Sequence, residues 1–112
     1  MELLELMKMV RCFHEKHDFA NNNGSDMNFR MLLMMEEVGE LAECLTKGKG
    51  MEDIREELAD IFILLLGHCV VLDIDLEKVF LDKMDKIMQR KAIKVKNGIR
   101  VTEYRGEGTE EI

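Results

Sequence analysis

Two pairs of acidic residues stand at positions where apolar helices place their core-facing side chains. Glu37 and Glu40 lie in the segment MMEEVGELAEC, and Glu57 and Asp60 lie in IREELADIFILLL. At about 100° per residue, the two members of each pair are about 60° apart and share a face with apolar neighbours. A carboxylate removed from water is costly unless a cation compensates its charge. A single ExxE pair would be better explained by a solvated face, but two such pairs indicate a cation site.

The chemistry expected of these acids is the binding of a divalent metal ion. The short GKG loop at residues 48–50 allows the two helices to pack antiparallel, so that four carboxylates converge. Like charges at short range repel and raise each other's pKa unless a metal ion neutralises them. Ligation by oxygen alone favours Mg²⁺, with Mn²⁺ as the alternative, and Mg²⁺ usually binds substrate phosphates as well.

A second group of charged residues follows nearer the end of the chain. Lys83, Lys86 and Arg90 fall within about 60° on one face of a predicted final helix. Such a face would suit a triphosphate. A solvated stripe paired with neighbouring acids such as Asp82 explains the same pattern almost equally well. Both interpretations stay open.

Hydrophobic periodicity predicts the four helices that would position these side chains. They are expected over about residues 2–19, 25–47, 51–72 and 75–91. Ser25 or Asp26 can cap the second helix, Asp75 can cap the fourth, and the glycines of GKG end the second. Because the loops are short, neighbouring helices should be antiparallel. The predicted fold is an all-α, four-helix antiparallel bundle.

Residues 92–112 depart from the helical pattern. In AIKVKNGIRVTEY an Asn-Gly pair lies between alternating β-branched residues, which predicts a β-hairpin. We expect a three-residue loop, Lys96 to Gly98 with Gly98 left-handed, because a two-residue Asn97-Gly98 loop would mix apolar and charged residues on each face. The expected pairs are Val95 with Ile99 and Ile93 with Val101. The final segment RGEGTEEI is expected to be a mobile tail.

Length and composition indicate one folded domain over residues 1–112. Hydrophobic residues make up 46% and charged residues 35%, without proline, which is typical of a helical protein. The net charge of -7 argues against a nucleic acid polymer or an anionic membrane as partner. The apolar run IFILLLGHCVVL is too short to span a bilayer. Cys12, Cys44 and Cys69 lack metal-ligand spacing and are expected to be reduced in a cytoplasmic protein.

The segments EEVGELAE and EELADIFILLL resemble the all-α nucleotide pyrophosphohydrolase superfamily, which includes MazG, all-α dUTPases and dCTPases, and phosphoribosyl-ATP pyrophosphohydrolase. The family pattern is ExxE, a gap of variable length, then ExxD, and the resemblance covers about residues 28–90. It implies Mg²⁺-dependent cleavage of a nucleoside triphosphate to the monophosphate and pyrophosphate, in a house-cleaning role. The matching acids would be the catalytic metal ligands: Glu37, Glu40, Glu57 and Asp60.

The resemblance also suggests roles for residues around these acids. Glu36 and Glu56 would act as a base or as outer-shell groups. Lys83 and Arg90 match a Lys and an Arg that members carry on the last helix, but Ile87 stands where they carry Asn. That departure keeps a second hypothesis open, in which the chain is a non-catalytic helical oligomerisation or nucleotide-sensing module.

Three further expectations concern packing. Apolar stripes on more than one helix face imply a homodimer or homotetramer with sites near the subunit interface. His68 lies about 12 Å along its helix from Asp60, so we expect a core or interface histidine and not a metal ligand. Phe29 and Arg30 either contact the base and phosphates or serve as a core residue and a surface cation.

Overall fold

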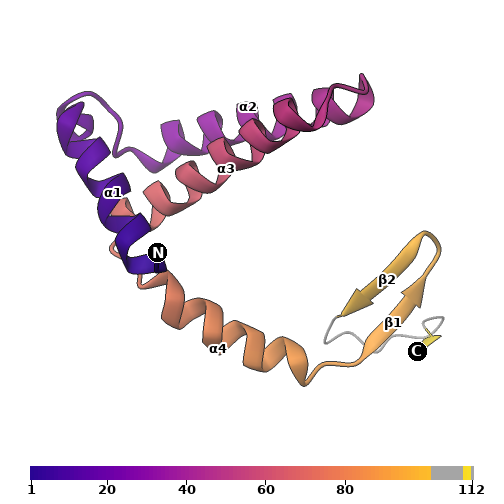
Figure 1. Cartoon of the computed structure of the whole chain (residues 1–112). Coiled ribbons are helices and arrows are strands. Elements are labelled where there is room, and N and C mark those ends of the chain that lie inside the picture. Colours follow the sequence, from indigo (N-terminus) through magenta and orange to yellow (C-terminus); the bar gives the residue numbers. More distant parts are fainter. Residues whose placement is uncertain (102–109, 112) are drawn as a thin grey trace. The chain divides into compact units, whose positions relative to one another are not determined.

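The computed structural model describes residues 1–101 and 110–111. The helical elements are α1 (Leu3–Lys16), the 3-10 turn η1 (Phe19–Asn21), α2 (Met27–Thr46), α3 (Met51–Leu72) and α4 (Leu76–Met88). The strands β1 (Ala92–Val95), β2 (Gly98–Val101) and β3 (Glu110–Glu111) follow (Figure 1). The predicted all-α class, with four helices and a C-terminal hairpin, is confirmed. The chain forms two compact units, Met1–Leu76 and Glu77–Ile112.

The first helix is shorter than predicted. α1 ends at Lys16, and Asp18 adopts a left-handed conformation with φ of 50°. The Asp18 carboxylate accepts hydrogen bonds from the side-chain amide of Asn21 at 2.9 and 3.2 Å, which stabilises the turn into η1. Asp and Asn favour such local bonds over helix continuation. The predicted end at residue 19 is therefore wrong.

Both ends of α2 follow the predicted signals. The carboxylate of Asp26 accepts a hydrogen bond from the backbone N–H of Asn28 at 3.2 Å, so Asp26 is the N-cap. At the other end Gly48 is left-handed, with φ of 65°. The backbone N–H of Lys49 donates to the carbonyl of Cys44 at 2.9 Å, which closes the last turn. The chain then reverses direction and α3 begins at Met51.

Within the first unit, α2 and α3 lie side by side as an antiparallel hairpin, and α1 packs against α3 (Figure 1). Val10 of α1, Cys44 of α2, and Leu66 and Cys69 of α3 are buried in its core. Many other large apolar side chains on these helices are exposed. Among the described residues, no helix combines the length and apolar character needed to cross a bilayer.

In the second unit the fourth helix is also shorter than predicted. α4 ends at Met88, and the backbone N–H of Arg90 donates to the carbonyl of Ile87 at 3.0 Å in a closing turn. Lys83 and Lys86 therefore lie on α4, whereas Arg90 lies beyond it. The predicted helical face that combined all three cations is correct only for the two lysines.

The predicted register of the hairpin is wrong. β1 and β2 pair antiparallel through a two-residue loop, Lys96 and Asn97, with Val95 opposite Gly98 and Ile93 opposite Arg100. Gly98 is not among the left-handed residues of the described chain. The prediction treated the segment as an isolated hairpin, but β1 is the central strand of a sheet ordered β2-β1-β3. Neighbours on both edges of β1, and not the loop alone, constrain its register.

Only part of the final segment RGEGTEEI, which was expected to be mobile, lies among the described residues. Glu110–Glu111 pairs with β1, opposite Lys94 and Ile93, so this piece of the expected mobile segment is a strand. The other residues of that segment, 105–109 and 112, lie outside the described residues.

Candidate metal centre

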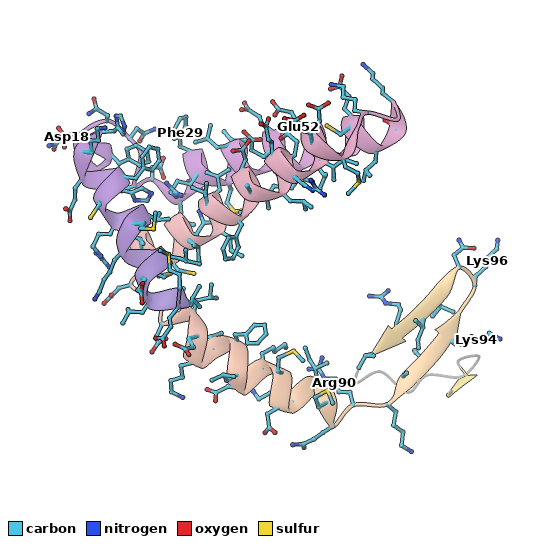
Figure 2. All side chains as sticks on the ribbon, in the orientation of Figure 1. Asp18, Phe29, Glu52, Arg90, Lys94 and Lys96 are labelled. Carbon is cyan, nitrogen blue, oxygen red and sulfur yellow. The ribbon has the colours of Figure 1, made fainter. Side chains whose placement is uncertain are left out.

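Three of the four predicted acids converge where α2 and α3 face each other. Glu37 and Glu40 on α2 and Glu57 on α3 each offer a carboxylate oxygen, and these oxygens all lie within 4.8 Å of one another. Asp60 is exposed and lies outside this group. Figure 2 shows carboxylate oxygens along the side of the α2–α3 hairpin where Glu52 is labelled. The helical spacing thus places three carboxylates at one point.

Two oxygen atoms of this cluster lack the partners that buried acceptors normally have. Oε2 of Glu37 and Oε2 of Glu57 are buried, and neither has a hydrogen-bond partner among the described residues. Buried polar atoms are otherwise almost always satisfied. A cation between the two helices would satisfy both atoms at once. Because all donors are carboxylate oxygens, the set fits a hard divalent ion such as Mg²⁺.

The acids also perturb one another's protonation. Burial raises the pKa of Glu37 to about 7, assisted by a hydrogen bond with Glu57 and by the negative charges of Glu40, Asp60 and Glu57. At Glu57 the hydrogen bond from Glu37 lowers the pKa, but burial together with Glu40 and Asp60 outweighs it and raises the pKa overall. Without a cation the cluster therefore retains a proton near neutral pH. Asp60 contributes to this field although it lies outside the group of three.

Residues 27–93 match the MazG nucleotide pyrophosphohydrolase domain. The chain belongs to this family. The matched region begins at the first residue of α2 and contains all four predicted acids. Searches of curated proteins and of solved structures give no significant match.

Other residues assigned to the site from the sequence are not members of the group of three glutamates in this MazG domain. Glu36 and Glu56 are exposed and do not join the group. Lys83 and Lys86 are exposed on α4 of the second unit. Arg90, which is labelled in Figure 2, is half-buried after this helix. Asp82, proposed as a partner for this stripe, forms an ion pair with Lys78 at 2.9 Å.

Sequence reasoning missed the role of Arg30, which is neither a surface cation nor available to phosphates. Its side chain is 1% exposed in the first unit. Nε donates to Nδ1 of His68 at 3.0 Å, one Nη donates to the carbonyl of Gly24 at 3.0 Å, and the other donates to the carbonyl of Leu64 at 3.2 Å. The prediction that His68 is a core histidine is confirmed. The sequence did indicate that Arg30 is buried, since Arg30 stands two helical turns before Glu37 on the same inward-facing stripe of the helix.

Burial and the charge of Arg30 together favour the neutral form of the histidines near it. Burial and the Arg30 charge lower the pKa of His68. Burial lowers the pKa of His14 as well, with contributions from Arg30 and Arg11. Burial lowers the pKa of Arg30 itself, but arginine remains protonated in proteins. Near neutral pH the buried Arg30 cation thus lies close to two neutral imidazoles, those of His68 and His14.

Proposed function

We propose that the protein is a Mg²⁺-dependent nucleoside triphosphate pyrophosphohydrolase. It would cleave a (d)NTP to the monophosphate and pyrophosphate, in a house-cleaning role. The observation that carries the proposal is the convergence of Glu37, Glu40 and Glu57, with two buried oxygens that lack partners, inside a MazG domain.

The three converging glutamates would hold the ion, and the exposed Asp60 would complete the acidic set. Mg²⁺ bound there would supply charge neutralisation for the phosphates and lower the pKa of a bound water. Glu37 would release its proton when the cation enters, because both cannot occupy the cluster. Glu36 and Glu56, each next to a converging glutamate in the sequence, are proposed as the base or as outer-shell carboxylates.

The cations of the second unit are proposed to bind the phosphates. Replacing Lys83 by Gln removes a charge-assisted contact worth about 1.5–3 kcal/mol, so we expect KM to rise roughly tenfold or more while kcat changes less. Lys86 and Arg90 are proposed to act in the same way. Lys78→Gln is the matched control on α4, since Lys78 is paired with Asp82. Steady-state kinetics would contradict this assignment if both variants had the same KM as the wild type.

The exposed apolar surface supports self-association. On α2, Leu32 and Met35 are 65% and 59% exposed, and on α3 Leu58 is 51% exposed. Leu32 and Met35 stand three residues apart on one face of α2, and contiguous exposed apolar side chains are typical of an interaction surface. We propose a homodimer or homotetramer. We also propose a cytoplasmic location, since Cys12, Cys44 and Cys69 are free thiols.

The test is pyrophosphate release from a panel of ribo- and deoxyribonucleoside triphosphates. With Mg²⁺ we expect equal amounts of monophosphate and pyrophosphate, and with a chelator in place of Mg²⁺ we expect neither. Separate assay of orthophosphate and nucleoside diphosphate distinguishes cleavage at another bond. A correctly folded protein that releases no pyrophosphate from any nucleotide would contradict the proposal.

One residue favours a second candidate function. Ile87 is half-buried on α4 and offers no polar group where family members carry Asn. A non-catalytic oligomerisation or nucleotide-sensing module is therefore the alternative. Metal-dependent binding of nucleotide without any product would support it.

A further inference from the structure

The hydrogen bonds of Arg30 constrain how α2 can lie against α3. A buried guanidinium is costly unless its donors are satisfied, and within the described residues no carboxylate bonds to it. Its partners are instead a ring nitrogen of α3 and two carbonyl oxygens, one on α3 and one in the loop before α2. Sliding α3 by one residue would move its two acceptors, Nδ1 of His68 and the carbonyl of Leu64, by about 1.5 Å and 100°. Donors would then be left unpaired, so only one register satisfies Arg30.

Gly67 gives the guanidinium the space it occupies. A Cβ atom at position 67 would collide with Nη2 of Arg30 and would lie 3.0 Å from Nε2 of His14. Gly67 itself is buried in the middle of α3, where glycine costs roughly 1 kcal/mol of helix stability relative to alanine. The close approach of Arg30 is the physical reason for glycine at this position.

The same register brings the acids together. Arg30 stands seven residues before Glu37, and its acceptor Leu64 stands seven residues after Glu57. Seven residues are about two helical turns and return to the same face. In an antiparallel pair, the alignment that places Arg30 against Leu64 therefore also places Glu37 against Glu57. We propose that Arg30, held by His68 and accommodated by Gly67, is a positioning residue that sets the register of the acidic cluster. The inference rests on the proposed metal-binding function of that cluster.

Two variants disturb this contact to different degrees. Gly67→Ala introduces a methyl group into the guanidinium site while improving intrinsic helix propensity. His68→Leu removes the acceptor of Nε. His68→Asn is the conservative variant, because its Oδ1 can replace Nδ1 as the acceptor. Val10→Ala is the control for general destabilisation, since Val10 is buried on α1 and does not bond to Arg30.

The first readout is the affinity for Mn²⁺ without nucleotide, measured by electron paramagnetic resonance of free Mn²⁺ at pH 8. We expect Gly67→Ala and His68→Leu to weaken binding about tenfold or more, as loss of supporting groups around metal ligands usually does. His68→Asn and Val10→Ala should stay within about twofold of the wild type. Melting temperatures of the same samples show whether a loss of affinity follows stability alone.

The second readout needs no metal. Glu57→Gln removes a charge that faces Glu37 and Glu40, so it should raise the melting temperature of the metal-free wild type and of Val10→Ala. In the background of Gly67→Ala or His68→Leu, Glu57→Gln should change the melting temperature little, because the carboxylates of α2 and α3 would no longer face each other. This double-mutant comparison measures the coupling between Arg30 and the cluster directly.

The outcomes separate the two proposals. Wild-type affinity and an intact response to Glu57→Gln in Gly67→Ala and His68→Leu would overturn the positioning role and leave the proposed function standing. A loss of Mn²⁺ affinity in Val10→Ala as large as that in Gly67→Ala and His68→Leu would also overturn the positioning role. A wild type that binds no Mn²⁺ would contradict the proposed function, while the metal-free comparison would still decide the positioning role. If the wild type also fails to respond to Glu57→Gln, the acids do not converge and both proposals are overturned.

Discussion

Glu37→Gln is expected to reduce turnover by at least about a hundredfold while raising the melting temperature of the metal-free protein. The substitution keeps the shape of the side chain and removes its charge. Turnover falls because one carboxylate of the proposed metal site is lost. At pH 8, above the Glu37 pKa of about 7, stability rises because the neighbours Glu40, Glu57 and Asp60 no longer repel a charge at this position. Most variants at an ordinary core or surface site would instead lower stability or leave it unchanged.

The matched control is Glu43→Gln on the same helix. Glu43 is exposed and pairs with Lys47, with Oε1 and Nζ 2.7 Å apart, and lies outside the cluster of three glutamates. Because an exposed ion pair contributes little, turnover and melting temperature should stay close to the wild type. Pyrophosphate assays and calorimetry on both variants check the pair of results. A fall in melting temperature for Glu37→Gln with unchanged turnover would contradict the assignment of Glu37 to the metal site.

The metal-free protein should lose stability as the pH rises from about 4.5 to about 7 because of Glu37. The pKa of this group is about 7 when folded and near 4.5 when unfolded, so the folded chain binds more protons in that range. The sign is opposite to that of an acid in an ion pair, whose lowered pKa makes stability rise with pH. Saturating Mg²⁺ should reverse the loss, with a gain of about 2.7 kcal/mol at a hundredfold excess over Kd.

The measurement is the free energy of unfolding from pH 5 to pH 8, with chelator and with Mg²⁺. His14 and His68 act in the opposite direction, because a histidine with a lowered pKa loses stability as the pH falls below 6.5. Subtracting the profile of Glu37→Gln from that of the wild type cancels this contribution. A difference profile without slope between pH 5 and 7 would show that Glu37 is not held in a crowded acidic cluster.

The features that the sequence predicts well depend on local periodicity. Glu37, Glu40 and Glu57 come together because helical spacing fixes which side chains share a stripe, and the left-handed Gly48 fixes where the hairpin turns. Asp26 caps α2 because its short carboxylate reaches a nearby backbone N–H. These determinants all lie within a few residues of the feature they control.

The features that the sequence predicts poorly depend on contacts between distant residues. The register of β1 is constrained by β3 as well as by β2, and the sequence near the loop contains no record of that third strand. Arg30 is buried because His68 and Leu64 accept its hydrogen bonds from 38 and 34 residues away. A charged residue on an apolar stripe can be either a group that binds a metal or substrate or a buried residue that is hydrogen-bonded within the protein. Only the position of its hydrogen-bond acceptors distinguishes the two cases.

The tight reversal at Gly48 also determines how the α2–α3 hairpin could be lengthened without disturbing the acids. Adding seven residues to each arm of the hairpin would move the reversal outward by about two turns of each helix and leave every inward face unchanged. The carboxylates would keep their mutual alignment. This alignment depends on the register of the two helices and not on the distance of the acids from the bend. Additions that are not close to whole helical turns would rotate one acidic pair away from the other. The spacings between ExxE and ExxD that keep the acids aligned should therefore recur at intervals of about seven residues, one helical turn on each arm.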